Sequence, residues 1–279
     1  MIQPTTQNVS GDYCDLSGEE FFRITNVQKM NEFFLPIVSA FDHWMFITSH
    51  GALTAGRKNS SKSLFPYYCA DKIIDGASST GSLTIVRVQR SDGELVHWSP
   101  MGGATAPDSK ISQSLYRNVS GSKIIFEEVN HDLELTYRYS WSFSQKFGFV
   151  RESCLSNDAA FPQSCTILDG LQNILPATID PTFQMRFSNL GDAYKRSERL
   201  QSTDLGIYYL SSIPSDRAEP NEGLRATVVW STGLERARLL LSSRQVEQFR
   251  LGGLVKAESD VRGSRGAYLK VAEIDLPAG

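Results

Sequence analysis

Regular alternation of apolar and polar side chains is the feature that most limits how this chain can fold. Between residues 132 and 139 every second side chain is apolar, and these side chains are Leu133, Leu135, Tyr137 and Tyr139. Successive side chains of a strand point to opposite faces, so this period of two predicts a strand with one buried face and one polar face. The apolar run "SKIIFEEV" precedes it across Asn130 and His131. The two runs together predict an antiparallel hairpin.

Other strand-like runs are separated by turn residues. "SLTIVRVQ" and "ELVHW" flank "RSDG", which predicts a second hairpin. Later runs of the same kind are "FGFVRESCL", "CTILDGLQ", "GIYYLSSI", "RATVVW" and "AYLKVAEIDL". Only residues 183–200 and 242–251 have a helical pattern, the second with Ser242 and Gln245 at capping-box spacing. Many strands with few helices predict an all-β fold, a large antiparallel double-sheet sandwich with one or two short helices.

The domain organisation follows from length and from the polar N-terminus. Residues 1–20 are mostly polar and predict a loosely ordered leader, ending in a helical turn where Ser17 and Glu20 form a capping box. Residues 21–279 predict one β-sandwich domain, because all-β sandwiches reach this size without dividing. That region contains no internal sequence repeat.

Charge and hydropathy exclude several classes of partner. The net charge is −3, so no overall basic field attracts nucleic acid or an anionic membrane. The sequence contains no run of 18 apolar residues, so it predicts no membrane span. The N-terminus lacks the basic and apolar segments typical of a secretory signal. We therefore expect a cytoplasmic protein that binds neither nucleic acid nor membrane.

The four cysteines lack metal-ligand spacing. They are Cys14, Cys69, Cys154 and Cys165, with no C-x-x-C pair among them. Free thiols are expected in a reducing compartment. One alternative stays open: if residues 149–168 form a symmetric hairpin, Cys154 and Cys165 lie opposite each other and a disulfide is geometrically allowed.

Local catalytic motifs are absent from the sequence. It contains no G-x-G-x-x-G, no G-x-x-x-x-G-K-[ST], no G-x-S-x-G, no H-E-x-x-H and no calcium loop. We therefore predict no metal site, no cofactor and no catalytic residue. Two carboxylates of a glycosidase need no local motif, and Glu127, Glu128, Asp132 and Glu134 surround one hairpin. A solvated strand face is the simpler interpretation of these four residues.

Aromatic and charged residues gather in the first hundred residues. "HWMFITSHGALTAG" predicts two core strands around a turn, and the loop after it carries charged and aromatic side chains. The candidate contact residues are His43, Trp44, Arg57, Lys58, Tyr67, Tyr68 and Trp98. Flat rings beside hydrogen-bond donors suit a sugar, but Tyr, Trp and Arg are also the usual anchors of protein interfaces. We favour an interface over a sugar pocket.

Long segments of the chain resemble a known family. "FFRITNVQKMNEFFLPIVSAFDHWMFITSHGALTAGRKNSSKSLFPYY", "YRNVSGSKIIFEEVNHDLELTYRYSWSFSQKFGFVRES" and "ILDGLQNILP" resemble the N-terminal region of large bacterial proteins related to cellobiose phosphorylase, of the glycoside hydrolase family 94 type. The resemblance implies a super-β-sandwich similar to the galactose mutarotase fold, placed ahead of an (α/α)6 barrel that holds the catalytic acid and the phosphate site. It also implies that the sandwich packs against the barrel and contributes to a dimer.

Three functions remain to be distinguished. The first is a non-catalytic N-terminal sandwich domain of a glycoside phosphorylase or hydrolase, whose partners are a missing C-terminal catalytic domain and a second copy. The second is a sugar epimerase of mutarotase type, with His97 or His131 as acid and Glu128 or Glu134 as base. The third is a free-standing carbohydrate-binding module that binds an oligosaccharide. We favour the first, in which the fragment itself is inactive and cut short before the barrel.

Overall fold

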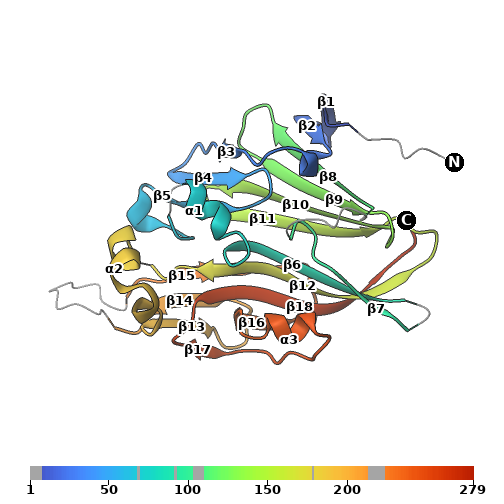
Figure 1. Cartoon of the computed structure of the whole chain (residues 1–279). Coiled ribbons are helices and arrows are strands. Elements are labelled where there is room, and N and C mark those ends of the chain that lie inside the picture. Colours follow the sequence, from blue (N-terminus) through green and yellow to red (C-terminus); the bar gives the residue numbers. More distant parts are fainter. Residues whose placement is uncertain (1–7, 68–69, 91–92, 103–109, 178, 213–223) are drawn as a thin grey trace. The chain divides into compact units, whose positions relative to one another are not determined.

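Antiparallel strands make up most of the structure (Figure 1). The structure is a computed structural model and describes residues 8–67, 70–90, 93–102, 110–177, 179–212 and 224–279. The all-β class predicted from the sequence is confirmed. The chain divides into two compact units. Unit 1 comprises residues 1–51, 103–162 and 276–279, and unit 2 comprises residues 52–102 and 163–275.

Unit 1 is built on a six-stranded antiparallel sheet with the strand order β1-β2-β8-β9-β10-β11. Its strands are β1 (Ser10–Leu16), β2 (Glu19–Thr25), β8 (Ile111–Asn118), β9 (Ile124–Asn130), β10 (Leu135–Ser144) and β11 (Gly148–Asn157). A 3-10 turn, η1 (Val27–Lys29), follows β2, and β3 (Phe34–Ile37) then pairs with β4 (His43–Thr48). All of these pairs are antiparallel.

The first hairpin of unit 1 corrects the sequence prediction for residues 1–20. Residues 10–16 form β1 instead of a loose leader, and the predicted helical turn at Ser17 is a two-residue hairpin turn to β2. Ser17 and Gly18 both have positive φ, 57° and 84°. Two consecutive positive φ values define the hairpin turn that matches strand twist, and they are incompatible with a helix start.

Alternation in the middle hairpin is realised as predicted. β9 and β10 pair across the turn that follows Asn130. Leu135, Tyr137 and Tyr139 are 0%, 1% and 3% exposed, and the Tyr139 ring stacks on Phe126 at 4.8 Å between centroids. These side chains form the buried face of the sheet of unit 1.

Unit 2 contains two antiparallel sheets and three short α-helices. One sheet has the order β16-β18-β12-β6-β7 and the other the order β15-β14-β13-β17. The strands of these two sheets are β6 (Gly81–Gln89), β7 (Leu95–Trp98), β12 (Gln163–Ile174), β13 (Lys195–Arg199), β14 (Gly206–Leu210), β15 (Thr227–Val229), β16 (Arg238–Ser242), β17 (Asp260–Arg262) and β18 (Gly266–Leu276). Unit 2 also contains β5 (Leu53–Arg57), which belongs to neither sheet. The helical segments are η2 (Ser60–Lys62), α1 (Ala70–Asp75), α2 (Pro181–Asp192) and α3 (Val246–Arg250).

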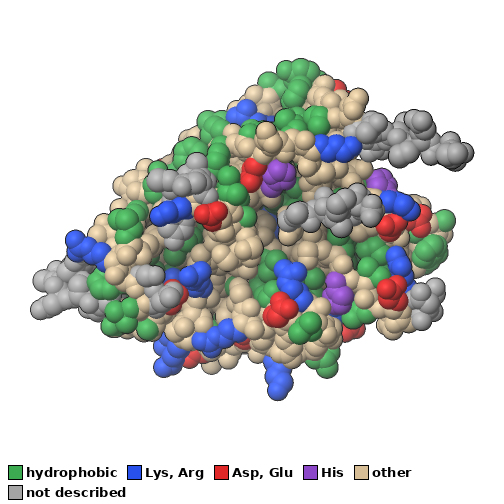
Figure 2. Space-filling model, in the orientation of Figure 1, with side chains coloured by type: hydrophobic (Ala, Val, Ile, Leu, Met, Phe, Trp, Pro, Cys, Tyr) green, Lys and Arg blue, Asp and Glu red, His purple; other side chains and the backbone are tan. Residues whose placement is uncertain are grey.

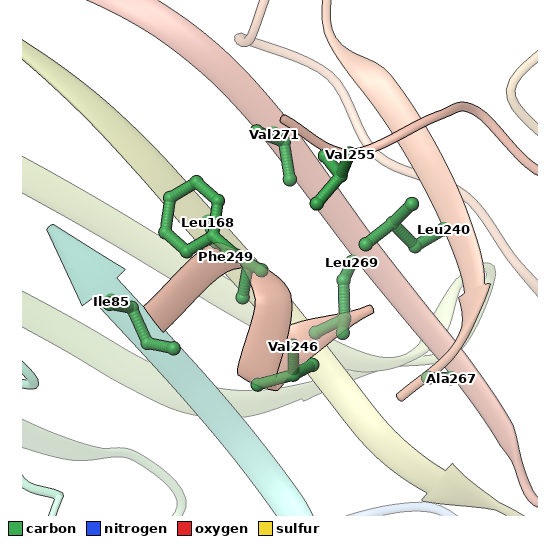
Figure 3. Close-up of a cluster of buried hydrophobic side chains, with 9 residues drawn as sticks. All are labelled: Ile85, Leu168, Leu240, Val246, Phe249, Val255, Ala267, Leu269 and Val271. Carbon is green, nitrogen blue, oxygen red and sulfur yellow. The ribbon is translucent and has the colours of Figure 1, made fainter. Parts of the chain in front are cut away.

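Helix α3 closes the core of the five-stranded sheet (Figure 3). Its Val246 and Phe249 pack with buried side chains of β6, β12, β16 and β18. The Arg87 guanidinium lies 4.1 Å above the Phe249 ring and donates to the carbonyls of Phe249 and Gly253. Arg87 therefore holds both the ring and the C-terminal end of this short helix.

The two helix predictions are confirmed only in part. The predicted helix over 183–200 ends at Asp192, and β13 begins at Lys195. Asp180 caps α2, because its Oδ1 accepts from the Phe183 amide at 2.6 Å. The predicted helix over 242–251 is confined to α3, where Gln245 is the N-cap residue but makes no capping hydrogen bond. Its side chain instead bonds Lys256 and Glu258.

A disulfide between Cys154 and Cys165 is excluded by strand pairing. Cys154 lies opposite Arg138 on β10, and Cys165 lies opposite Val88 on β6. The symmetric hairpin over 149–168 does not form, because its two strands pair with β10 and β6. Both thiols are free, and burial raises the pKa of Cys165 to about 11, with Asp275 adding to the effect. Cys69 lies outside the described residues.

Thiol labelling will distinguish the two cysteines. In the native protein, Cys154 is exposed and should react with an aromatic disulfide reagent, whereas Cys165 is 6% exposed and protonated at neutral pH. Peptide mapping by mass spectrometry should find modified Cys165 only after denaturation. A crosslinked Cys154–Cys165 peptide in a non-reducing digest would contradict the strand pairing.

Gly170 is required by the close approach of β12 and β18. Its φ is 154°, and a Cβ at this position would lie 2.0 Å from the carbonyl oxygen of Tyr268. Gly170→Ala should lower the free energy of unfolding by about 3 kcal/mol, because the backbone of β18 must move. Urea unfolding followed by circular dichroism measures this change.

Gly233→Ala is the matched control. Gly233 also has a positive φ, 99°, but no atom of the neighbouring residues that the structure describes lies within 4 Å of the added Cβ. Only backbone strain should act there, at about 1 kcal/mol. Equal losses in the two variants would show that close approach at Gly170 contributes nothing.

Candidate functional site

An open groove on unit 1 is the candidate functional site. It has a volume of about 330 Å³ and is lined by Tyr13, Phe22, Ile24, Leu35, Leu115, Arg117, Asn118 and Val119. We call it the aromatic groove. Its residues come from β1, β2, β3 and β8 and the residue after β8, so it lies toward the β1 edge of the sheet. Figure 2 shows hydrophobic side chains gathered where β1 and β2 lie in Figure 1.

Cross-strand register brings the groove residues to one face. Tyr13 lies opposite Phe22, Phe22 lies opposite Arg117, and Ile24 lies opposite Leu115. Opposed residues of an antiparallel pair point to the same side, so strand pairing alone assembles this surface. The Tyr13 and Phe22 rings meet edge to face, 5.2 Å between centroids.

Large apolar side chains of the groove stay exposed to solvent. Tyr13 is 68% exposed, Val119 is 64% and Phe22 is 39%. Gly11, opposite Ile24 on the same face, leaves room for the Phe22 ring, because a Cβ there would lie 2.7 Å from Phe22 Cζ. Exposed apolar side chains that adjoin one another mark contact surfaces more often than isolated ones do.

The amide group at the groove already has hydrogen-bond partners. Asn118 Nδ2 donates to Glu19 at 2.7 Å, to Ser120 at 2.9 Å and to Ser122 at 3.0 Å, and its Oδ1 accepts from the Lys123 amide at 2.9 Å. Both N–H donors of the amide are thus used within unit 1, and Oδ1 accepts one hydrogen bond there.

The arginine of the groove is also tied to the backbone. Arg117 Nη2 donates to the Pro36 carbonyl at 3.3 Å, while its Nε is buried and has no partner among the described residues. The groove therefore offers an apolar surface with few accessible polar atoms.

Charged side chains on the opposite face of the same sheet are paired. Arg23 donates to both oxygens of Asp12, at 3.0 and 2.7 Å, and this contact lowers the pKa of Asp12. Glu127 accepts from Tyr116 at 2.7 Å and from Arg138 Nε at 2.9 Å. Burial and the hydrogen bond to Glu127 raise the pKa of Tyr116 to about 12. The ionised groups neutralise one another across the strands.

Two of the four carboxylates proposed from sequence for glycoside hydrolysis, Glu127 and Glu128, do not face each other. Glu127 and Glu128 are adjacent on β9, so they point to opposite faces of the sheet. Glu128 is 2% exposed and accepts from Gln113 at 2.7 Å. Their hydrogen bonds give both carboxylates a structural role.

The residues proposed from sequence as acid–base pairs of an epimerase lie in both units, and the hydrogen bonds shown for His131 and Glu128 are to other side chains. His97 belongs to unit 2, whereas Glu128 and Glu134 belong to unit 1. His131 Nε2 lies 2.9 Å from Ser112 Oγ, and Glu128 bonds Gln113 instead.

The seven contact residues predicted from sequence lie on several elements of the two units. His43 and Trp44 belong to unit 1, and Arg57, Lys58, Tyr67 and Trp98 belong to unit 2, while Tyr68 lies outside the described residues.

Two of these residues are buried in the cores. His43 is 8% exposed, stacked on Phe143 at 5.6 Å and in edge contact with Phe149 at 5.1 Å. Trp98 is 4% exposed in β7. Arg57, Lys58 and Tyr67 are exposed, and Trp44 is half-buried. The aromatic groove itself was missed, because residues 1–20 were assigned to a loose leader.

Metal clusters and membrane-spanning helices are not found among the residues that the structure describes. These residues contain no group of three or more His, Cys, Asp or Glu side chains able to hold a metal ion. None of their helices has the length and apolar character needed to cross a membrane. No protein-family model matches the chain, and no curated protein matches it.

Removal of Glu127 should destabilise unit 1. Glu127→Ala leaves the buried Tyr116 hydroxyl and Arg138 without their shared acceptor. We expect a loss of about 2 kcal/mol in the free energy of unfolding, measured by urea denaturation.

Asp132→Ala is the control for that variant. Asp132 pairs with Lys110 at 3.1 Å, but both side chains are exposed. An exposed pair of this kind contributes about 0.5 kcal/mol. If the two variants lost the same amount, the hydrogen bonds of Glu127 would not be structural.

Proposed function

We propose that the chain is a non-catalytic β-domain of a carbohydrate-active glycoside phosphorylase or hydrolase, and that unit 1 docks through the aromatic groove onto a second copy of the chain. The docking role rests on one observation: the groove is apolar and exposed, and the side-chain amide of Asn118 beside it already has hydrogen-bond partners. The carbohydrate-active parent rests on the sequence resemblance.

An apolar partner fits the groove better than a sugar does. Sugar recognition needs donors and acceptors that face the hydroxyl groups, and both N–H donors of Asn118 are already used within unit 1. An apolar side chain needs only surface to cover, and the exposed faces of Tyr13, Phe22 and Val119 supply it. This supports a protein partner.

The edge of the sheet supports a second copy as that partner. β1 is the terminal strand of the six-stranded sheet, and its outer edge has no strand partner among the described residues. Such an edge pairs readily with another strand. Two copies related by a two-fold axis can each insert Tyr13 into the groove of the other, since a two-fold interface uses the same patch twice.

The finer fold assignment belongs to the same proposal. A super-β-sandwich of galactose mutarotase type is the arrangement that the resemblance implies for these antiparallel sheets. An (α/α)6 catalytic barrel in the same polypeptide would then supply the chemistry, in the cytoplasm. The present chain would contribute docking surface and no reacting group.

Carbohydrate binding is the second candidate, because one observation favours it. The Tyr13 ring is 68% exposed beside Phe22, and a flat exposed ring can stack on the apolar face of a sugar. In that case the groove would bind an oligosaccharide and the chain would act as a binding module.

Sedimentation velocity will test the docking proposal. We expect the chain to dimerise, and the double variant Tyr13→Ser/Val119→Ser to weaken the dimer at least tenfold, which is about 1.4 kcal/mol. The control is Phe147→Ser, since Phe147 is 54% exposed on unit 1 but lies outside the groove. It should leave the association unchanged.

Titration with cello-oligosaccharides separates the two candidates. Saturable shifts of the Tyr13 and Phe22 signals in NMR spectra would favour the binding module. A chain that stays monomeric at all concentrations, or a double variant that dimerises as well as Phe147→Ser, would contradict docking through the groove.

A further inference from the structure

A second cavity, within unit 2, has polar chemistry that the docking role does not use. It has a volume of about 70 Å³ and lies beside α2 and the start of β13. Gln184, Asp192, Lys195 and Arg265 provide charged and amide groups to its lining. We call it the basic cavity.

The basic cavity has an excess of positive charge. Lys195 is 8% exposed, and its Nζ contacts Asp192 Oδ1 at 2.6 Å. Arg265 Nε donates to the other oxygen, Asp192 Oδ2, at 3.3 Å. Two cations thus share one carboxylate, and one positive charge remains uncompensated among the groups that line the cavity. Because the carboxylate is shared, an anion beside Lys195 and Arg265 would balance the remaining positive charge.

An unsatisfied acceptor lines the same cavity. Gln184 Oε1 is buried and has no hydrogen-bond partner among the described residues. The Nε2 of the same amide donates to the Asp180 carbonyl at 3.4 Å. This bond identifies Oε1 as the atom of the amide that lacks a partner. An unsatisfied buried acceptor costs stability until a donor reaches it. The ligand that completes this site therefore carries an O–H or N–H group.

Size and apolar walls limit the ligand further. Leu175, Ile179 and Phe183 give the lining an apolar side. One water needs about 10–15 Å³ of such volume, so the cavity holds a ligand of about five or six non-hydrogen atoms. A bare oxyanion such as phosphate would leave the apolar walls without a partner. A short alkyl group covers them.

We propose that the basic cavity binds a small monoanionic hydroxycarboxylate of the size of lactate. Its carboxylate lies against Lys195 and Arg265, its hydroxyl donates to Gln184 Oε1, and its alkyl group packs on Leu175 and Phe183. An amino acid is disfavoured, because its ammonium group would lie beside two cations. Binding in the basic cavity does not depend on the docking role of unit 1.

NMR titration of the full 279-residue chain tests this assignment, with lactate as the probe and sodium chloride at matched ionic strength. We expect saturable shifts at Gln184, Lys195 and Arg265 with a dissociation constant of about 1 mM, as suits so few atoms. Propionate, which lacks the hydroxyl, should bind at least fivefold more weakly. Phosphate should bind more weakly than lactate.

Two variants identify the contacts. Arg265→Gln, at a side chain that is 51% exposed, should weaken lactate about tenfold, whereas Arg250→Gln on α3 should have no effect. Gln184→Leu should remove the preference for lactate over propionate while propionate still binds. The proposal is overturned if lactate causes no shift at about 20 mM, well above the expected constant. It is also overturned if phosphate binds as tightly, or if Gln184→Leu keeps the preference.

Discussion

Cross-strand register in the six-stranded sheet is the constraint on which the chemistry of unit 1 depends. It sets Tyr13 opposite Phe22 on one face, while Asp12 lies opposite Arg23 on the other. A shift of one residue would exchange the two faces, burying the ion pair and exposing the core. The turn at Ser17 and Gly18, with positive φ at both residues, holds that register from the first hairpin onward. The aromatic groove is thus a product of strand pairing, without any loop dedicated to it.

Local patterns predicted the structure where they agreed with long-range pairing. Leu135, Tyr137 and Tyr139 alternate with polar residues and are buried as expected. Prediction failed where a partner strand is distant in sequence: Cys154 pairs with the preceding strand β10, but Cys165 pairs with the distant strand β6, so their symmetric spacing carried no information about contact. The capping box at Ser17 failed because its spacing also suits a hairpin turn. The groove was missed because its residues are distant from one another in sequence. β1 contributes Tyr13, and β8 contributes Arg117, which lies 104 residues further along the chain.

Satisfied and unsatisfied polar groups separate structural residues from candidate contact residues. Glu127 and Glu128 looked like possible catalytic carboxylates in sequence, yet each is engaged by neighbours on its own face of the sheet. Asn118 is likewise engaged at the groove. A group whose hydrogen bonds are complete inside the fold has little left with which to recognise a ligand. The exposed apolar surface of the groove is therefore the feature of unit 1 best suited to an interaction.

Polar groups at the cavity of unit 2, by contrast, have incomplete hydrogen bonding and incomplete charge pairing. There Lys195 and Arg265 share one carboxylate, and Gln184 Oε1 lacks a donor among the described residues. A domain under selection for stability alone would gain by replacing such groups with apolar side chains of similar volume, because buried ion pairs seldom add net stability. Asp192 already has two cationic partners, so a second anion is what the balance of charge requires. The buried Lys195 beside the unsatisfied amide of Gln184 is the arrangement from which we infer a ligand.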